Sequence, residues 1–454
     1  MGKQIGRTVL VGGLLSLAGA AADVDPAVAV QGEAAVFTAP TGRIVENVRA
    51  TSDSSRSFAL YVPTSYTPDR EWPLVMIMDP RGRGVPPLRK LVPAAERLGY
   101  VVASSSNTAS DVGGDPNTPA VNAMLATLQP RLSLDDRRFY LFGMSGTARI
   151  AWSLAYAGIP HFAGVAGFGA GIPPDMDLGE AVEDHGAPFA FYGGAGDRDY
   201  NYGELVVLGN RLDRLGFDHT TVTYGGRHGW PPDEAEFEAA LSWLHMAAMR
   251  QGRLEPDTGW LNAEYESRLA AARELEDDGR HGPAWRAYAS LAADVNGLLE
   301  RTEAGERAVA LADDPEVSRW RARRLELARA HLEYEDRATA WLRATADAGD
   351  GLPGLDEAIE ALAVDSLQAL ADGADDAEPD DPSAAAWRAL SSLFSMTSFY
   401  FPRFAIDARD WDRARLMLWI ANSIVPGAPP VCRQYERVAR ELGDVRSLAG
   451  CARP

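Results

Sequence analysis

Between residues 57 and 250, short apolar runs alternate with segments whose apolar residues recur at helical spacing. Residues 74–78 are apolar throughout, which is typical of a strand buried on both faces of a parallel sheet. Phe237, Leu241 and Leu244 share one face of a helix that closes this region. The alternation predicts an α/β fold, with a mostly parallel sheet and helices on both faces. The other predicted strands cover residues 58–63, 100–103, 139–142, 162–168, 189–192 and 220–224.

Helical periodicity alone continues after about residue 254. It is clearest in residues 265–275, 284–299 and 317–332, and helices resume at residue 383. The acidic stretch 372–381 between them predicts an exposed linker. Residues 253–454 are therefore predicted to form a separate all-α domain.

The first 22 residues have the pattern of an export signal. Lys3 and Arg7 provide a positive start, residues 8–17 are apolar, and small residues follow at 18–22. The apolar run is about half of the ~20 residues that a membrane-spanning helix needs. We expect residues 1–22 to be a cleaved signal peptide and the protein to be periplasmic or extracellular, the alternative being a short anchor that stays attached.

Composition and charge narrow the class of protein. Of the 454 residues, 46% are hydrophobic and 24% are charged, which indicates two or three folded domains. The formal net charge of -20 repels phosphate backbones, so nucleic acid is not expected as a partner. The two cysteines, Cys432 and Cys451, could form a disulfide in an oxidising compartment or remain separate thiols.

A candidate nucleophile lies where the strand 139–142 gives way to a helix. Gly143-Met144-Ser145-Gly146-Thr147 matches the Gly-x-Ser-x-Gly elbow except at its fifth position, where threonine replaces glycine. A serine on such a sharp turn projects its hydroxyl above the carboxyl edge of the sheet. Ser145 is therefore the predicted nucleophile.

The acid and the histidine of a catalytic triad should follow in that order, each after a later strand. Strand 189–192 leads to Asp197 and Asp199, and strand 220–224 leads to His228. An imidazole must accept the serine proton, and a carboxylate must orient that imidazole. We assign His228 as the base and favour Asp197 as the acid, with Asp199 as the alternative.

The tetrahedral oxyanion of acyl transfer needs two preorganised N–H donors. By position, Gly146 provides one. The other should come from the loop after residues 74–78, in which Pro80 has no N–H, so Arg81 or Gly82 is the expected donor.

Neither a metal nor a cofactor is predicted. The stretch that begins at Asp197 resembles the start of a calcium loop, but Tyr202 and Leu208 stand where that loop requires Gly and Glu. Two histidines at metal-binding helical spacing do not occur in the sequence.

Residues 57–250 resemble the polyhydroxybutyrate depolymerase and feruloyl-esterase branch of the α/β-hydrolase superfamily. The resemblance rests on the strand ending in Val62-Pro63, the loop 79–82, the serine elbow, and the Gly-x-His-x-Trp-Pro sequence at 226–231. It implies a carboxylic ester substrate, either a small molecule or a polymer. The helical half weakly resembles tetratricopeptide repeats, with Asp410, Trp411 and Ala414 leading through a helix to Pro426.

The predicted organisation is a signal peptide (1–22), a linker or edge strand (23–50), an α/β-hydrolase domain (51–252) and a helical domain (253–454). The predicted function is an exported serine esterase. One alternative is a partner- or peptide-binding protein whose hydrolase domain is degenerate, with the helical half as its binding surface. Another is a serine peptidase that uses the same triad, since specificity depends on the pocket.

Overall fold

The computed structural model of the chain describes residues 40–158, 161–174, 176–179, 189–347, 351–444 and 448–451. The predicted signal peptide, 1–22, lies outside the described residues, as does most of the segment 23–50. The described part of that segment contains an edge strand, which is one of the two expected alternatives, a linker or an edge strand.

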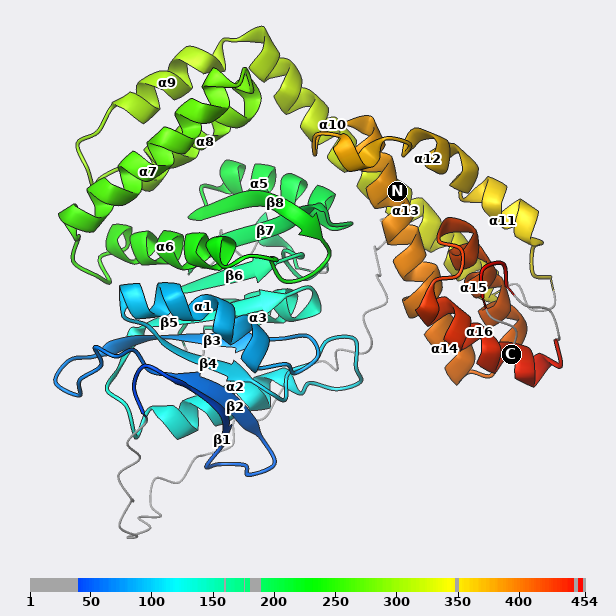
Figure 1. Ribbon diagram of the computed structural model, residues 1–454, viewed down its shortest axis with the longest axis horizontal. Helices are drawn as coiled ribbons and strands as arrows, with labels where there is room; N and C mark the ends of the chain where they lie inside the picture. Colours follow the sequence, from blue (N-terminus) through cyan, green and yellow to red (C-terminus); the bar gives the residue numbers. More distant parts are fainter. Residues whose placement is uncertain are drawn as a thin grey trace, which may run out of the picture. The chain divides into compact units, whose positions relative to one another are not determined.

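One sheet forms the centre of the first part of the chain. Its strands are β1 (Ile44–Arg49), β2 (Ser57–Tyr61), β3 (Trp72–Met78), β4 (Val101–Ser105), β5 (Leu134–Met144), β6 (Gly164–Phe168), β7 (Ala190–Arg198) and β8 (His219–Arg227). In the described residues their order is β1-β2-β4-β3-β5-β6-β7-β8 (Figure 1). β2 is antiparallel to β1 and β4, whereas the pairs β3/β4, β3/β5, β5/β6 and β6/β7 are parallel. The predicted mostly parallel sheet is confirmed.

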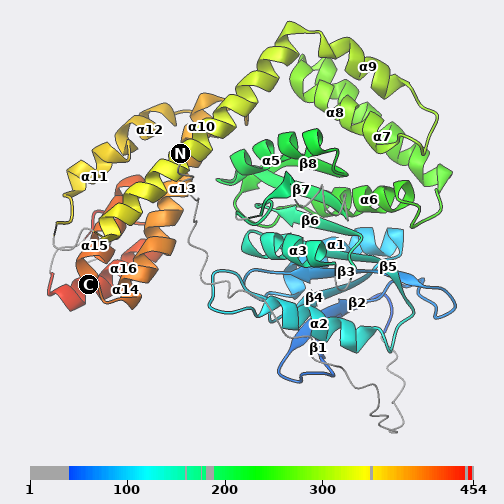
Figure 2. The same ribbon diagram turned by 180° about the vertical axis from the view of Figure 1, so that it is seen from behind.

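Helices cover both faces of this sheet (Figures 1 and 2). They are α1 (Val85–Leu98), α2 (Asn117–Leu128), α3 (Gly146–Ala157), α5 (Tyr202–Leu215) and α6 (Glu234–Arg250). α1 packs beside α6, and α2 beside α3. Under α1 and α6, Leu88 and Leu241 join Ile77 of β3 in a fully buried apolar core. Every residue of β3 is buried, which explains why its sequence is apolar at consecutive positions.

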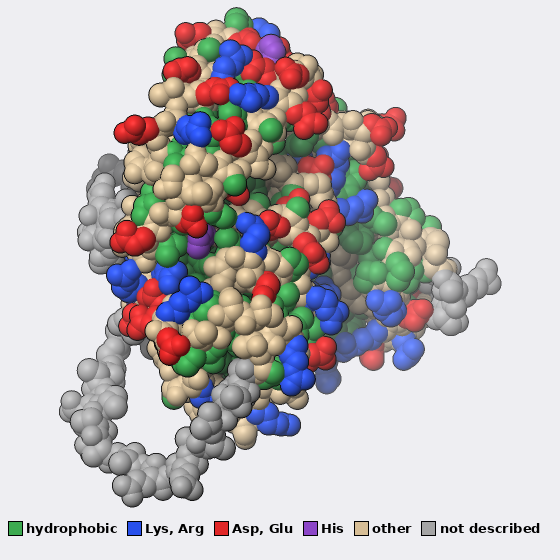
Figure 3. Space-filling model, turned by 60° about the vertical axis from the view of Figure 1, so that its left-hand side comes forward, with side chains coloured by type: hydrophobic (Ala, Val, Ile, Leu, Met, Phe, Trp, Pro, Cys, Tyr) green, Lys and Arg blue, Asp and Glu red, His purple; other side chains and the backbone are tan. Residues whose placement is uncertain are grey.

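On the face drawn in Figure 3, acidic and basic side chains are interspersed. Of the helices in the described part of the chain, none has both the length and the apolar character that would be needed to cross a membrane.

Two compact units divide the chain. The first contains the chain up to Ala195 together with Leu208–Tyr224 and Gly229–Ala312. The second contains Gly196–Val207, Gly225–His228 and the chain from Asp313 onwards. The boundary predicted between residues 252 and 253 thus falls inside the first unit, and the carboxyl ends of β7 and β8 belong to the second.

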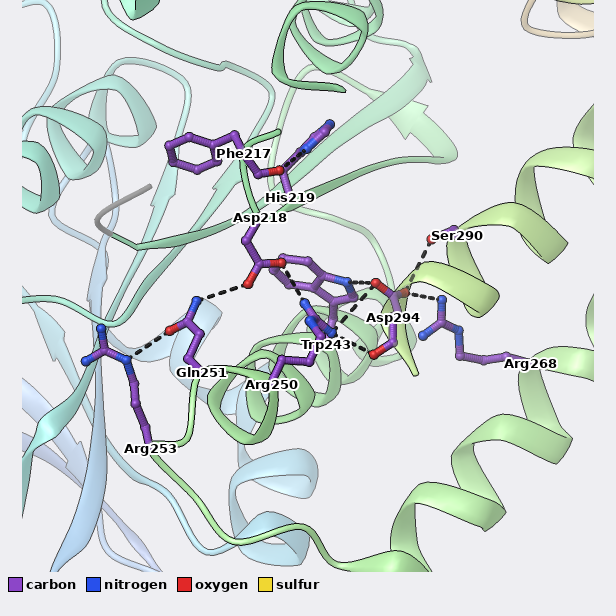
Figure 4. A network of polar contacts seen from close by, with 10 residues as sticks. All are labelled: Phe217, Asp218, His219, Trp243, Arg250, Gln251, Arg253, Arg268, Ser290 and Asp294. Carbon is purple, nitrogen blue, oxygen red and sulfur yellow. Dashed lines mark hydrogen bonds and ion pairs between the residues drawn. The ribbon is translucent and has the colours of Figure 1, made fainter. Parts of the chain in front are cut away.

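The first unit includes three helices that follow the sheet, α7 (Thr258–Asp277), α8 (His281–Asp294) and α9 (Glu303–Ala312). Figure 4 shows the polar network that attaches them, centred on the buried carboxylate of Asp294. This carboxylate accepts hydrogen bonds from Trp243 on α6 at 2.8 Å and from Arg268 on α7 at 2.6 Å. Arg250 donates to the Asp294 carbonyl at 3.0 Å and to Asp218 at 2.8 Å. These helices are therefore joined to the sheet by buried, charged hydrogen bonds.

Helices make up most of the second unit, in agreement with the predicted all-helical region. They are α10 (Pro315–Asp347), α11 (Leu355–Ala361), α12 (Val364–Leu370), α13 (Pro382–Ser395), α14 (Phe401–Asp407), α15 (Trp411–Ile424) and α16 (Pro429–Leu442). Between α13 and α14 lies a π-helical turn, Met396–Tyr400. Cys432 and Cys451, whose pairing the sequence left open, form a disulfide with a Cα–Cα distance of 5.6 Å. The resemblance to tetratricopeptide repeats stays a prediction.

The acidic stretch 372–381 is not the exposed linker that its charge predicts. Ala374 is buried, in a short 3-10 helix. The carbonyls of Ala374 and Ala377 accept hydrogen bonds from the guanidinium of Arg198, at 2.8 Å in the case of Ala377. Asp372, Asp375 and Asp376 are exposed, while backbone carbonyls of the same stretch bind Arg198, and the charge pattern does not predict these backbone contacts.

Candidate active site

The predicted elbow serine lies where the sequence places it, between the end of β5 and the start of α3. Ser145 has a φ of 55° and a ψ of -128°, a strained conformation for a residue with a Cβ. Its N–H donates to the carbonyl of Phe168 at 2.8 Å, and its carbonyl accepts from Ala148 at 2.9 Å. Backbone strain of this kind, held by neighbouring hydrogen bonds, is the property of a nucleophile elbow.

Gly143 and Thr147 explain how the elbow tolerates its departure from Gly-x-Ser-x-Gly. A Cβ at Gly143 would lie 2.5 Å from the carbonyl oxygen of Thr147, so glycine is required there. Thr147 is fully buried, and its hydroxyl lies 2.6 Å from the carbonyl of Met78 and 2.8 Å from that of Met144. The threonine therefore ties the elbow to the end of β3, and α3 packs without the glycine.

The second predicted oxyanion donor is not present in the expected form. Gly146 begins α3 as predicted. The N–H of Arg81, however, donates to the carboxylate of Asp79 at 2.8 Å, and the N–H of Gly82 donates to the Asp79 carbonyl at 3.1 Å. An aspartate side chain readily accepts a hydrogen bond from the backbone N–H two residues later and so forms a local turn. The position of the loop relative to the strand end does not reveal this hydrogen bond. Both backbone N–H groups are thus hydrogen-bonded within their own loop.

Asp79 is the centre of a buried hydrogen-bond cluster that the sequence did not reveal. Its carboxylate accepts from the Arg83 guanidinium at 3.0 and 3.1 Å and from the indole N–H of Trp230 at 2.8 Å. Burial by itself raises the pKa of Asp79, but hydrogen bonds from Arg83, Trp230 and Arg81 hold this pKa below its ordinary value. The charged carboxylate therefore anchors Trp230, two residues after His228.

His228 is paired with Asp199. The imidazole Nδ1 lies 2.8 Å from Asp199 Oδ1, and the same oxygen accepts from the N–H of Asn201 at 2.8 Å. The Asp199 side chain is fully buried, whereas the imidazole is 17% exposed. Tyr200 stacks on the imidazole with its ring centroid 4.1 Å away. With Nδ1 donating to the carboxylate, Nε2 is the nitrogen that can accept a proton.

Asp197, which the sequence favoured as the acid, takes a different role. Its carboxylate accepts from the N–H of Gly226 at 2.9 Å. The reason is the length of β7, which was predicted to end at residue 192 but continues to Arg198. Asp197 is thus still part of the strand, and Asp199, the alternative, is the first carboxylate beyond its end.

Known proteins that are similar to this chain are found among the solved structures. No protein-family model matches the chain, and no curated protein matches it. Among solved structures, FphF, a fluorophosphonate-binding serine hydrolase of Staphylococcus aureus, is 12% identical, with 45% of this chain and 99% of that chain covered and a TM-score of 0.38. A ferulic acid esterase is 13% identical, with 45% and 98% covered and a TM-score of 0.39. Esterase LipW from Mycobacterium marinum is 16% identical, with 45% and 82% covered and a TM-score of 0.36. At these identities and TM-scores, the matches assign no function to this chain.

Proposed function

We propose that this protein is a serine hydrolase that cleaves carboxylic esters. Ser145 is the nucleophile, His228 the general base, and Asp199 the acid that orients it. The observation that carries the proposal is the 2.8 Å contact between His228 Nδ1 and the buried Asp199 carboxylate. A histidine–aspartate pair that follows a strained serine elbow, in the chain order Ser, Asp, His, is typical of the catalytic triad of a serine hydrolase.

The order of the strands supports the same assignment. Ser145 follows β5, Asp199 follows β7 and His228 follows β8. In α/β sheets, ligands bind beyond the carboxyl ends of the strands, and each of the three residues directly follows such an end.

The reaction follows from these groups. His228 Nε2 accepts the proton of the Ser145 hydroxyl as the oxygen attacks the ester carbonyl carbon. Asp199 stabilises the imidazolium that forms, and the Gly146 N–H stabilises the oxyanion at the start of α3. The imidazolium then protonates the leaving alcohol, and water hydrolyses the acyl-enzyme by the same steps in reverse order.

The substrate class and the location are part of the proposal. The Gly-x-His-x-Trp-Pro resemblance supports a carboxylic ester, small or polymeric, as substrate. The disulfide between Cys432 and Cys451 supports an oxidising compartment, as export directed by residues 1–22 would provide. The partner-binding surface predicted in the helical half stays a prediction.

A labelling experiment tests the proposal. A fluorophosphonate probe should label the wild type and should leave Ser145→Ala unlabelled. Ser153→Ala is the matched control, because Ser153 lies exposed on the same helix. A series of p-nitrophenyl esters of increasing chain length then defines the acyl preference. Equal labelling of the wild type and Ser145→Ala would remove Ser145 from the mechanism.

A further inference from the structure

The second unit contains both the segment that carries Asp199 and the helices that pack around it. Arg388 of α13 is central to this packing and is only 2% exposed. Its Nη1 donates to the carbonyl of Asp197 and to that of Pro379, each at 2.9 Å. Its guanidinium also lies over the ring of Tyr202, 4.3 Å from the centroid. One buried arginine thus contacts the residues on both sides of Asp199.

We infer that Arg388 is a positioning residue for catalysis: it fixes the turn 197–202 so that the Asp199 carboxylate stays against His228. This inference rests on the function proposed above. It assigns to the helical region a role in the hydrolytic site.

Backbone hydrogen bonds within the turn fix the position of Asp199 relative to Asp197. The N–H of Asp199 donates to the Gly196 carbonyl at 3.0 Å, and the Asp199 carbonyl accepts from Tyr202 at 3.0 Å. The Asp197 carboxylate binds the Gly226 N–H, two residues before His228. Arg388 therefore holds, through Asp197, both the strand end that leads to the acid and the strand end that leads to the base.

Close backbone packing leaves this arrangement little freedom. A Cβ at Gly196 would lie 2.3 Å from the carbonyl oxygen of Gly226, so the two strand ends are in direct contact. A Cβ at Gly203 would lie 3.1 Å from the Ala328 carbonyl of α10. The segment is thus confined on one side by β8 and on the other by the helices.

A second set of contacts supports the turn at Tyr202. Its hydroxyl donates to Asp380 at 2.5 Å and accepts from Arg324 Nε at 3.2 Å. Arg324 and Asp380 also form an ion pair at 3.5 Å. Removing the Tyr202 hydroxyl therefore weakens the same support while leaving its ring under the guanidinium of Arg388.

The decisive variants are Arg388→Met and Arg388→Lys in the full chain, with p-nitrophenyl acetate as substrate. Misplacement of a catalytic group by about 1 Å reduces the rate on the order of 10²-fold, so we expect Arg388→Met to lose about that factor in kcat. KM should change by less than about threefold, because the ester-binding groups are unchanged. Arg388→Lys keeps a cationic donor and should recover part of kcat.

Arg415→Met is the matched control. Arg415 lies in the same unit and pairs with Asp412 at 2.6 Å and with Asp444 at 3.6 Å, and its guanidinium lies over Trp419. None of these partners belongs to the Asp199 or His228 segments. We expect Arg415→Met to retain wild-type kcat at equal folded concentration.

A spectroscopic readout separates positioning from general stability. The proton between His228 Nδ1 and Asp199 should give a downfield proton resonance, assigned by its loss in His228→Gln. We expect this resonance to disappear or broaden in folded Arg388→Met and to persist in Arg388→Lys and Arg415→Met. A folded Arg388→Met with wild-type resonance and kcat would overturn the inference. If Arg388→Met does not fold, Arg388→Gln decides, because glutamine is polar but too short to replace both of the bonds that Arg388 donates to the carbonyls of Asp197 and Pro379. A wild-type resonance and kcat in folded Arg388→Gln also overturns the inference.

The two proposals fail in different ways. A wild type that the fluorophosphonate probe does not label contradicts the proposed hydrolase. The resonance of the His228–Asp199 pair still reports, in that case, whether Arg388 controls its geometry. If the probe labels Ser145 but the Arg388 variants keep the wild-type kcat and resonance, only the positioning role of Arg388 is contradicted.

Discussion

The indole N–H of Trp230 donates a 2.8 Å hydrogen bond to the buried carboxylate of Asp79. Trp230→Phe keeps most of the aromatic packing but removes this donor from a buried anion. Loss of one partner of a buried charged acceptor costs about 1–3 kcal/mol. We expect the free energy of unfolding of Trp230→Phe, measured by urea denaturation, to fall by this amount. An unchanged urea midpoint would show that the remaining donors, Arg81 and Arg83, satisfy Asp79 by themselves.

The same carboxylate predicts a pH dependence. Although burial opposes it, hydrogen bonds from Arg83, Trp230 and Arg81 lower the pKa of Asp79 in the folded protein. A group with a lower pKa when folded stabilises the protein above its unfolded pKa, about 3.9, and loses that effect as the pH falls through the folded pKa. The stability advantage of the wild type over Asp79→Asn should therefore be largest near neutral pH and shrink below about pH 4. An equal difference at pH 7 and pH 3 would contradict this assignment.

Asp199 and Asp197 form a matched pair for testing the triad. Asp199→Asn loses the charge that fixes the tautomer of His228, so its kcat should fall on the order of 10⁴-fold. Asp197→Asn keeps an oxygen that can accept from the Gly226 N–H, and its kcat should fall far less. Steady-state hydrolysis of p-nitrophenyl acetate measures both. The reverse ranking would restore Asp197 as the acid.

Local patterns predicted the parts of this protein that local physics controls. β3 is buried on both faces, so its apolar run was recognisable without neighbours. Ser145 was recognisable because an elbow is defined by a few consecutive residues. His228 is predicted as the base because it directly follows a strand in the expected chain order.

Contacts between distant residues account for what the sequence did not predict. The choice between Asp197 and Asp199 depended on where β7 ends, and that end is set by pairing with neighbouring strands. Arg388 is an ordinary arginine in an alanine-rich helix, and its partner carbonyl at Asp197 is 191 residues away. Side-chain periodicity contains no information about such a pair.

His245 predicts a second pH dependence, in a window nearer to neutrality. Burial lowers the pKa of His245 to about 4, and its Nδ1 lies 3.0 Å from the hydroxyl of Tyr100. An unfolded histidine titrates near 6.5, so between about pH 4 and 6.5 the unfolded chain binds more protons and acid favours unfolding. His245→Gln removes this proton uptake, which contributes up to about 1.4 kcal/mol per pH unit. Urea midpoints of the wild type should fall more steeply from pH 7 to pH 5 than those of His245→Gln. Parallel curves would contradict the buried, neutral state of His245.

Asp294 tests whether the helices after the sheet are a separate domain, as the boundary predicted at residue 252 implies. Asp294 is 5% exposed, and its carboxylate accepts from Trp243 at 2.8 Å and from Arg268 at 2.6 Å. Removing one side of a buried charged pair costs about 3–5 kcal/mol, because the other charge is left without compensation. We expect Asp294→Ala to lose stability on that scale in urea, in the transition that reports the sheet.

Glu303→Ala is the control, since its partner Arg273 is exposed and such surface pairs contribute about 0–1 kcal/mol. If Asp294→Ala unfolds α7–α9 and leaves the transition of the sheet unchanged, the helices form an independent domain and the boundary at 252 is correct. A loss shared by both would show that the hydrolase core extends through Asp294.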